Sequence, residues 1–111
     1  MPTYNKLVRD RIPAIIKQQG KHPSTIVLAD KEYEHELRNK LNEEVEEYLT
    51  ASTTQETLEE LADIVEVVYA LATAHGSSAE QVEQIRANKL AERGGFHDRV
   101  FLERVDDDNN D

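Results

Sequence analysis

Five acidic residues stand at spacings suited to binding a metal ion. They form two pairs with one residue in front: Glu43, then Glu44 and Glu47, then Glu60 and Asp63. Residues three apart lie on the same side of a helix, so each pair can direct two carboxylates at one point. Carboxylates gathered there repel one another at neutral pH, and a hard divalent cation with oxygen ligands relieves that repulsion. The pattern predicts a site for Mg²⁺, with Mn²⁺ as the alternative ion.

A solvent-exposed helical face is the other explanation for acidic residues on a helix. The glutamates that fit this explanation are Glu32, Glu34, Glu36 and Glu46. The second pair differs because residues 61–74 are apolar at eleven of fourteen positions, with Asp63 and Glu66 as the only charges. A buried, unpaired carboxylate is costly, so a carboxylate in such a helix must be protonated, paired or bound to a metal.

The same apolar segment predicts an oligomer. A helix that is apolar nearly all round must be buried on several sides. A chain of 111 residues with two other long helices cannot surround it alone. We therefore expect another copy of the chain to cover part of this helix, in a homodimer or homotetramer.

Two long helices are expected to carry the carboxylates. Asp30 is a suitable N-cap for a helix over residues 31–51. Thr53 followed three residues later by Glu56 has the form of a capping box and predicts a helix over residues 54–75. An antiparallel hairpin of these helices would bring the two carboxylate pairs face to face.

Shorter signals mark the remaining elements. Ser77 and Glu80 repeat the capping pattern for a third helix that ends near Arg93. Pro13 suits the first turn of a short helix over residues 12–19. Two short strands are further expectations, over residues 25–28 and 99–105.

The expected fold is therefore all-α, a bundle of three main helices with a short N-terminal helix. The length of 111 residues indicates a single domain, over residues 1–105, followed by an acidic tail at residues 106–111. The absence of cysteine excludes a disulfide framework and a Cys-ligated zinc site.

Charge and hydropathy exclude further classes. The formal net charge of -10 argues against binding to nucleic acid, which needs a basic face. No apolar stretch reaches the roughly 18 residues of a membrane span, and the first ten residues lack the pattern of a signal peptide. We expect a soluble, cytoplasmic protein.

The acidic motifs resemble those of a known family. Glu43-Glu44-Val45-Glu46-Glu47 followed by Glu60-Leu61-Ala62-Asp63 is similar to the metal motif of the MazG-type all-α nucleoside triphosphate pyrophosphohydrolases, which include phosphoribosyl-ATP pyrophosphohydrolases. Residues 4–13 and 89–96 fit the same branch, so the resemblance extends from Tyr4 to about Leu102.

The resemblance implies an activity and a set of roles. The expected reaction is Mg²⁺-dependent cleavage between the α and β phosphates of a nucleotide, which releases pyrophosphate and a monophosphate. By motif match, the expected metal ligands are Glu44, Glu47, Glu60 and Asp63. Glu43 is expected to be a further ligand or the base that orients and deprotonates a water molecule.

A triphosphate also needs cationic side chains, and the sequence offers two groups. The first lies within about 60° on one side of the third helix: Arg86, Lys89 and Arg93. The second precedes the short helix: Lys6, Arg9 and Arg11. We expect the phosphates to meet Lys89, Arg93, Arg86, Lys6 and Arg9. The alternatives are stems that cover apolar surface, helix capping, and salt bridges to the acidic helices.

Two functions remain open from the sequence. The first is a nucleotide pyrophosphohydrolase whose substrate is a deoxynucleoside triphosphate, in nucleotide pool cleaning, or phosphoribosyl-ATP. The second is a non-catalytic, oligomeric helical module that regulates or binds a partner.

Overall fold

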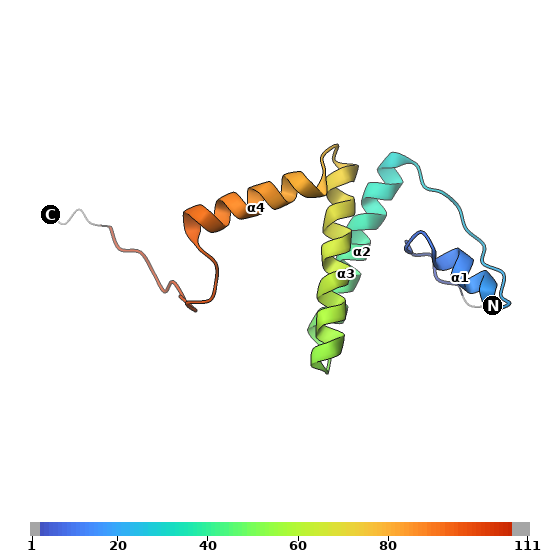
Figure 1. The fold of residues 1–111 in the computed structure, drawn as a ribbon, viewed down its shortest axis with the longest axis horizontal. Coiled ribbons are helices and arrows are strands. Elements are labelled where there is room, and N and C mark those ends of the chain that lie inside the picture. The colour runs from blue at the N-terminus through green and yellow to red at the C-terminus, as the bar shows by residue number, and fades with distance from the viewer. Residues whose placement is uncertain (1–2, 108–111) are drawn as a thin grey trace.

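The computed structural model describes residues 3–107 and contains four helices (Figure 1). They are α1 (Ile12–Gln18), α2 (Asp30–Thr50), α3 (Thr54–Ala74) and α4 (Ala79–Arg93). The all-α fold with three main helices and a short N-terminal helix is confirmed. No helix within the described residues is both long and apolar enough to cross a membrane. Residues 108–111 of the expected acidic tail lie outside the described residues.

The two expected strands are absent from residues 3–107. Residues 25–28 and 99–105 have no regular secondary structure, and Ile26 and Val27 are 84% and 100% exposed. A β-branched run favours extended backbone, but a strand needs a neighbour to satisfy its peptide groups. Neither segment has one, so the prediction of strands was wrong.

The connection between α2 and α3 is a tight turn fixed by side-chain hydrogen bonds. Thr53 Oγ1 accepts a hydrogen bond from the backbone N–H of Glu56 at 3.1 Å, as the capping box predicts. The Glu56 carboxylate reaches back one residue further than expected and accepts from the backbone N–H of Ser52 at 3.1 Å and from its hydroxyl at 3.0 Å. These bonds lower the pKa of Glu56, beginning with the one from the Ser52 backbone. The turn fixes the register of the hairpin.

Two helix starts differ from the sequence prediction by one residue. Asp30 is the first residue of α2, and the N-cap is Ala29, which offers no side-chain oxygen. In α4 the N-cap is Ser78, and its hydroxyl accepts from the backbone N–H of Gln81 at 3.1 Å. Ser77 and Ser78 are both good caps by type, so the sequence alone did not distinguish them.

The seam between α2 and α3 contains the small buried core. Its buried apolar side chains among the described residues are Leu37, Val67 and Ala72. The helices of this hairpin lie side by side along nearly their full length, whereas α4 packs only against α3 and leaves the hairpin near its end (Figure 1). The radius of gyration is 19.7 Å, against about 13 Å for a compact domain of about 100 residues. One chain therefore does not build a closed core.

Candidate metal centre

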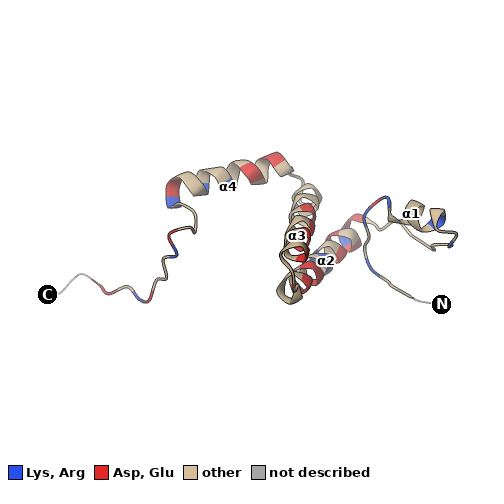
Figure 2. Cartoon of the chain, turned by 60° about the horizontal axis from the view of Figure 1, so that its bottom comes forward, with Lys and Arg blue, Asp and Glu red and all other residues tan. Residues whose placement is uncertain are grey.

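Three of the predicted ligands meet at the hairpin seam. A carboxylate oxygen of each lies within 4.8 Å of the others, with Glu44 and Glu47 on α2 and Glu60 on α3. Acidic residues occupy both helices there (Figure 2). The antiparallel arrangement expected from the spacing is the reason, because it sets one turn of α2 opposite one turn of α3. We call this group the carboxylate cluster.

The carboxylate cluster is partly withdrawn from water. Glu44 is 5% exposed and is the buried charged residue of the described chain. Its Oε2 atom, like Oε1 of Glu60, is buried without a hydrogen-bond partner. A buried carboxylate oxygen without a partner is costly, and two of them in one cluster must be relieved by protonation or by an external positive charge. The donor set therefore fits a divalent cation that prefers oxygen ligands.

The pKa values of Glu44 and Glu60 are raised, which is consistent with a lack of positive charge in the cluster. Burial raises the pKa of Glu44 to about 7, and the neighbouring carboxylate of Glu47 acts in the same direction. The pKa of Glu60 is also raised, first by loss of solvation and then by the negative charge of Glu47. In the absence of a cation, the folded chain retains protons on these groups beyond the ordinary carboxyl range.

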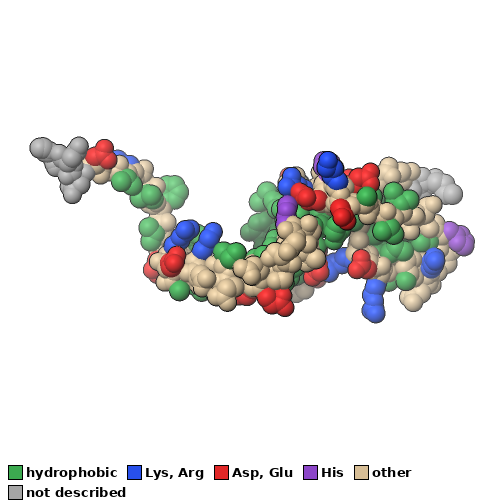
Figure 3. Space-filling view, turned by 90° about the horizontal axis from the view of Figure 1, so that it is seen from above, with side chains coloured by type: hydrophobic (Ala, Val, Ile, Leu, Met, Phe, Trp, Pro, Cys, Tyr) green, Lys and Arg blue, Asp and Glu red, His purple; other side chains and the backbone are tan. Residues whose placement is uncertain are grey.

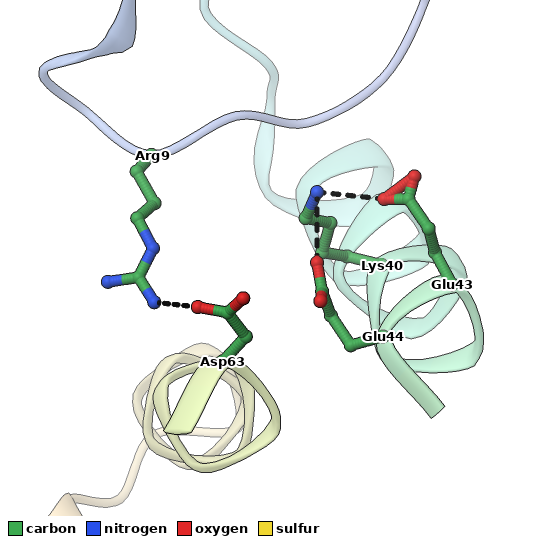
Figure 4. A network of polar contacts seen from close by, with 5 residues as sticks. All are labelled: Arg9, Lys40, Glu43, Glu44 and Asp63. Carbon is green, nitrogen blue, oxygen red and sulfur yellow. Dashed lines mark hydrogen bonds and ion pairs between the residues drawn. The ribbon is translucent and has the colours of Figure 1, made fainter. Parts of the chain in front are cut away.

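Asp63, the fourth predicted ligand, lies outside the carboxylate cluster. Its Oδ1 atom accepts a hydrogen bond from Nη2 of Arg9 at 2.6 Å (Figure 4). Arg9 belongs to the segment before α1, so this ion pair brings the N-terminal segment to α3. The sequence placed Arg9 among the phosphate contacts and left salt bridging as the alternative, and in this structure Arg9 forms the salt bridge.

Glu43 turns from the carboxylate cluster toward Lys40. The ammonium group of Lys40 donates to Glu43 Oε1 at 2.8 Å and lies 3.3 Å from Glu44 Oε1 (Figure 4). Burial acts to lower the pKa of Lys40, but the hydrogen bonds to Glu43 and Glu44 outweigh it and raise the pKa. The sequence interpretation missed Lys40. Its signal was available, because Lys40 precedes the two glutamates by three and four residues on one helix.

The basic residues of α4 do not approach the carboxylate cluster of their own chain. No residue of α4 is buried, and α4 leads away from the hairpin (Figure 1). Arg86 is engaged by Glu83, with contacts of 3.0, 3.1 and 2.6 Å. The inference that Arg86, Lys89 and Arg93 line a pocket wall is therefore not met within a single chain. Lys6 lies 6.0 Å from the ring centre of Tyr4.

Comparison with known proteins identifies the family. The model of the phosphoribosyl-ATP pyrophosphohydrolase family matches residues 8–89, which include Arg9, Lys40 and the five predicted acidic site residues. The chain belongs to this family. The family is part of the MazG-like all-α superfamily, so the resemblance seen in the sequence is confirmed.

One relative shows how far similarity extends along the chain. An uncharacterised protein of Mycolicibacterium smegmatis is 46% identical over 54 residues, which are 49% of this chain and 55% of the relative. The match thus spans about half of each protein. No solved structure matches the chain.

The raised pKa of Glu44 predicts how stability depends on pH in the presence of EDTA. The ordinary pKa is 4.5 and the folded value about 7, so the folded state holds a proton that the unfolded chain has lost between these values. Stability from this group is present below pH 4.5 and is lost as pH rises through about 7. Glu44→Gln cannot lose that proton. Its melting temperature should therefore rise relative to wild type as pH increases across this range.

Glu46→Gln is the control, because Glu46 is exposed on the same helix. It should keep the pH profile of the wild-type melting temperature. A difference between Glu44→Gln and wild type that stays constant with pH would contradict the assignment of the raised pKa to Glu44.

Proposed function

We propose that the chain is a Mg²⁺-dependent pyrophosphohydrolase that cleaves a nucleotide between its α and β phosphates. The observation that carries this proposal is the carboxylate cluster, with three oxygens within 4.8 Å and two buried oxygens without partners. Membership of the phosphoribosyl-ATP pyrophosphohydrolase family supports the reaction class. Substrates of this class are negatively charged, and a divalent cation bound by the acidic residues would attract their phosphate groups to the site.

Each acidic residue has a proposed role. Glu44, Glu47 and Glu60 would hold the ion, with Mn²⁺ as an alternative to Mg²⁺, and Asp63 would join them when it leaves Arg9. When bound, the ion would neutralise phosphate oxygens and position the attacking water. Glu43 would accept the proton of that water as its oxygen bonds to phosphorus. The bridging P–O bond breaks, and a monophosphate and pyrophosphate leave.

The phosphate contacts come from two places in this proposal. Arg9 is already at α3 through Asp63, and Lys6 lies on the same N-terminal segment. Lys89 and Arg93, with Arg86, would act from the α4 helix of a second copy, because α4 leads away from its own hairpin. Charge-assisted hydrogen bonds of this kind would hold the outer phosphates.

Exposed apolar surface supports assembly with a second copy. Leu58, Leu61 and Val65 form a stripe on α3 and are 56%, 41% and 46% exposed. Beyond α4, Phe96 and Phe101 are 97% and 87% exposed, and Figure 3 shows apolar side chains along that segment. Contiguous apolar surface of this kind marks an interface in a soluble protein. We propose a homodimer or homotetramer.

Leu58→Glu tests this assembly. We expect light scattering to give the wild type at least twice the 12.7 kDa mass of one chain. Leu58→Glu introduces a charge into the apolar stripe and should shift the mass toward a single chain. Glu59→Gln is the control and should not, because it changes the charge of an exposed residue that lies about 100° from Leu58 around the helix. A wild type that stays monomeric at micromolar concentration would refute both the shared interface and the supply of Lys89 from a second copy.

The non-catalytic alternative and the choice of substrate are decided by one activity screen. It measures pyrophosphate release with Mg²⁺ from deoxynucleoside triphosphates and from phosphoribosyl-ATP. Release from any of these supports the enzyme, and the preferred substrate distinguishes pool cleaning from a biosynthetic role. If no nucleotide yields pyrophosphate, the module that regulates or binds a partner is the better account. The cytoplasmic location and the lack of nucleic acid binding stay predictions.

Glu47→Gln and Glu46→Gln test the site with neighbouring residues of the same type. Both glutamates are exposed, but only Glu47 belongs to the carboxylate cluster. Loss of a ligand should lower kcat/KM for the best substrate by about 100-fold or more, because the metal site loses both affinity and geometry. Glu46→Gln should stay within about twofold of wild type. Equal losses in the two variants would show that the wrong face of α2 was assigned.

A further inference from the structure

Lys40 is a cationic residue directly beside the proposed metal site. It lies on α2 one turn before Glu43 and Glu44, and its side chain is 19% exposed. Its ammonium group contacts both carboxylates, at 2.8 Å and 3.3 Å. Lys40 belongs to neither of the two predicted groups of basic residues, and it has no role in the mechanism proposed above.

The contact with Lys40 gives the two oxygens of the Glu44 carboxylate different surroundings. Oε1 faces Lys40, whereas Oε2 is buried without a partner. One oxygen is thereby held, and the other is left for the carboxylate cluster with Glu47 and Glu60. Lys40 also ties Glu43 to the same ammonium group, which sets the proposed base beside the ligand that follows it in sequence.

An ordinary surface pair on the same helix shows the contrast. Arg38 and Glu34 form an i,i+4 ion pair at 2.8 Å, with the arginine side chain 62% exposed. Exposed pairs of this kind contribute little to stability. Lys40 loses more solvation than Arg38, and its charge faces carboxylates that repel their neighbours, so its removal leaves partly buried negative charge without compensation.

We propose that Lys40 is a positioning residue that orients Glu43 and Glu44 and neutralises part of the carboxylate cluster before a divalent cation binds. This inference rests on the proposed function, since it assumes that the cluster receives the cation. A bound cation supplies the positive charge that the cluster lacks. The stabilising effect of Lys40 should therefore be large without the ion and small with it.

Melting temperatures of Lys40→Met in EDTA and in saturating Mn²⁺ test this role. The comparison is made at about pH 8, above the pKa of about 7 of Glu44. The variant should melt about 5 °C below wild type in EDTA and less than half as far below it in Mn²⁺. Lys40→Arg, which restores the charge, should recover most of the loss in EDTA. Arg38→Met is the control and should match wild type in both conditions.

The outcomes distinguish the role of Lys40 from the existence of the metal site. Equal losses in EDTA and Mn²⁺, or no loss in either, would overturn the role of Lys40 while leaving the metal site in place. A wild type whose melting temperature does not respond to Mn²⁺ would overturn the proposed metal site, and the role of Lys40 with it. Should Lys40→Met fail to fold, Lys40→Gln, which keeps a hydrogen-bond donor without the charge, gives the same comparison.

Discussion

Repulsion among the carboxylates of Glu44, Glu47 and Glu60 is the constraint on which the site depends. The hairpin brings their oxygens within 4.8 Å of one another, and the turn at Thr53 fixes the register that does so. The energy for this comes from the apolar contacts of the seam, such as Leu37, because hydrophobic burial outweighs local repulsion. The repulsion appears as raised pKa values of Glu44 and Glu60. A bound cation would relieve this repulsion, and the relief would favour binding of the cation.

The chain places its positive charges at the edge of the carboxylate cluster and leaves the centre without one. Lys40 meets Glu43 and one oxygen of Glu44, while Arg9 meets Asp63. A centre that lacks an internal counter-ion keeps its oxygens available for an external one. A cation bound at this centre would also explain how so acidic a chain can act on a polyanionic nucleotide, as we propose.

The hairpin and its carboxylates could be predicted from the sequence because they depend on local rules. Capping at Thr53 and the repeated spacing of three residues are properties of single helices, and they bring Glu44 and Glu60 together once the hairpin forms. The partner of Asp63 could not be predicted, because Arg9 reaches it from a loop more than fifty residues away in sequence. The course of α4 depends on contacts outside the α2–α3 seam, which no local pattern encodes. Lys40 also follows a local rule, because it stands three and four residues before Glu43 and Glu44 on one helix, yet it belongs to neither of the two basic groups that the sequence pattern marks.

Direct titration of Mn²⁺ into the metal-free protein by calorimetry tests the central claim that the carboxylate cluster is a metal site. Glu60→Gln removes a cluster oxygen, whereas Glu59→Gln changes an exposed neighbour that accepts a hydrogen bond from Gln55 at 3.0 Å. We predict saturable binding to the wild type and to Glu59→Gln, and an affinity at least about tenfold lower for Glu60→Gln. Binding of equal strength to all three proteins, or no binding to the wild type, would contradict the account.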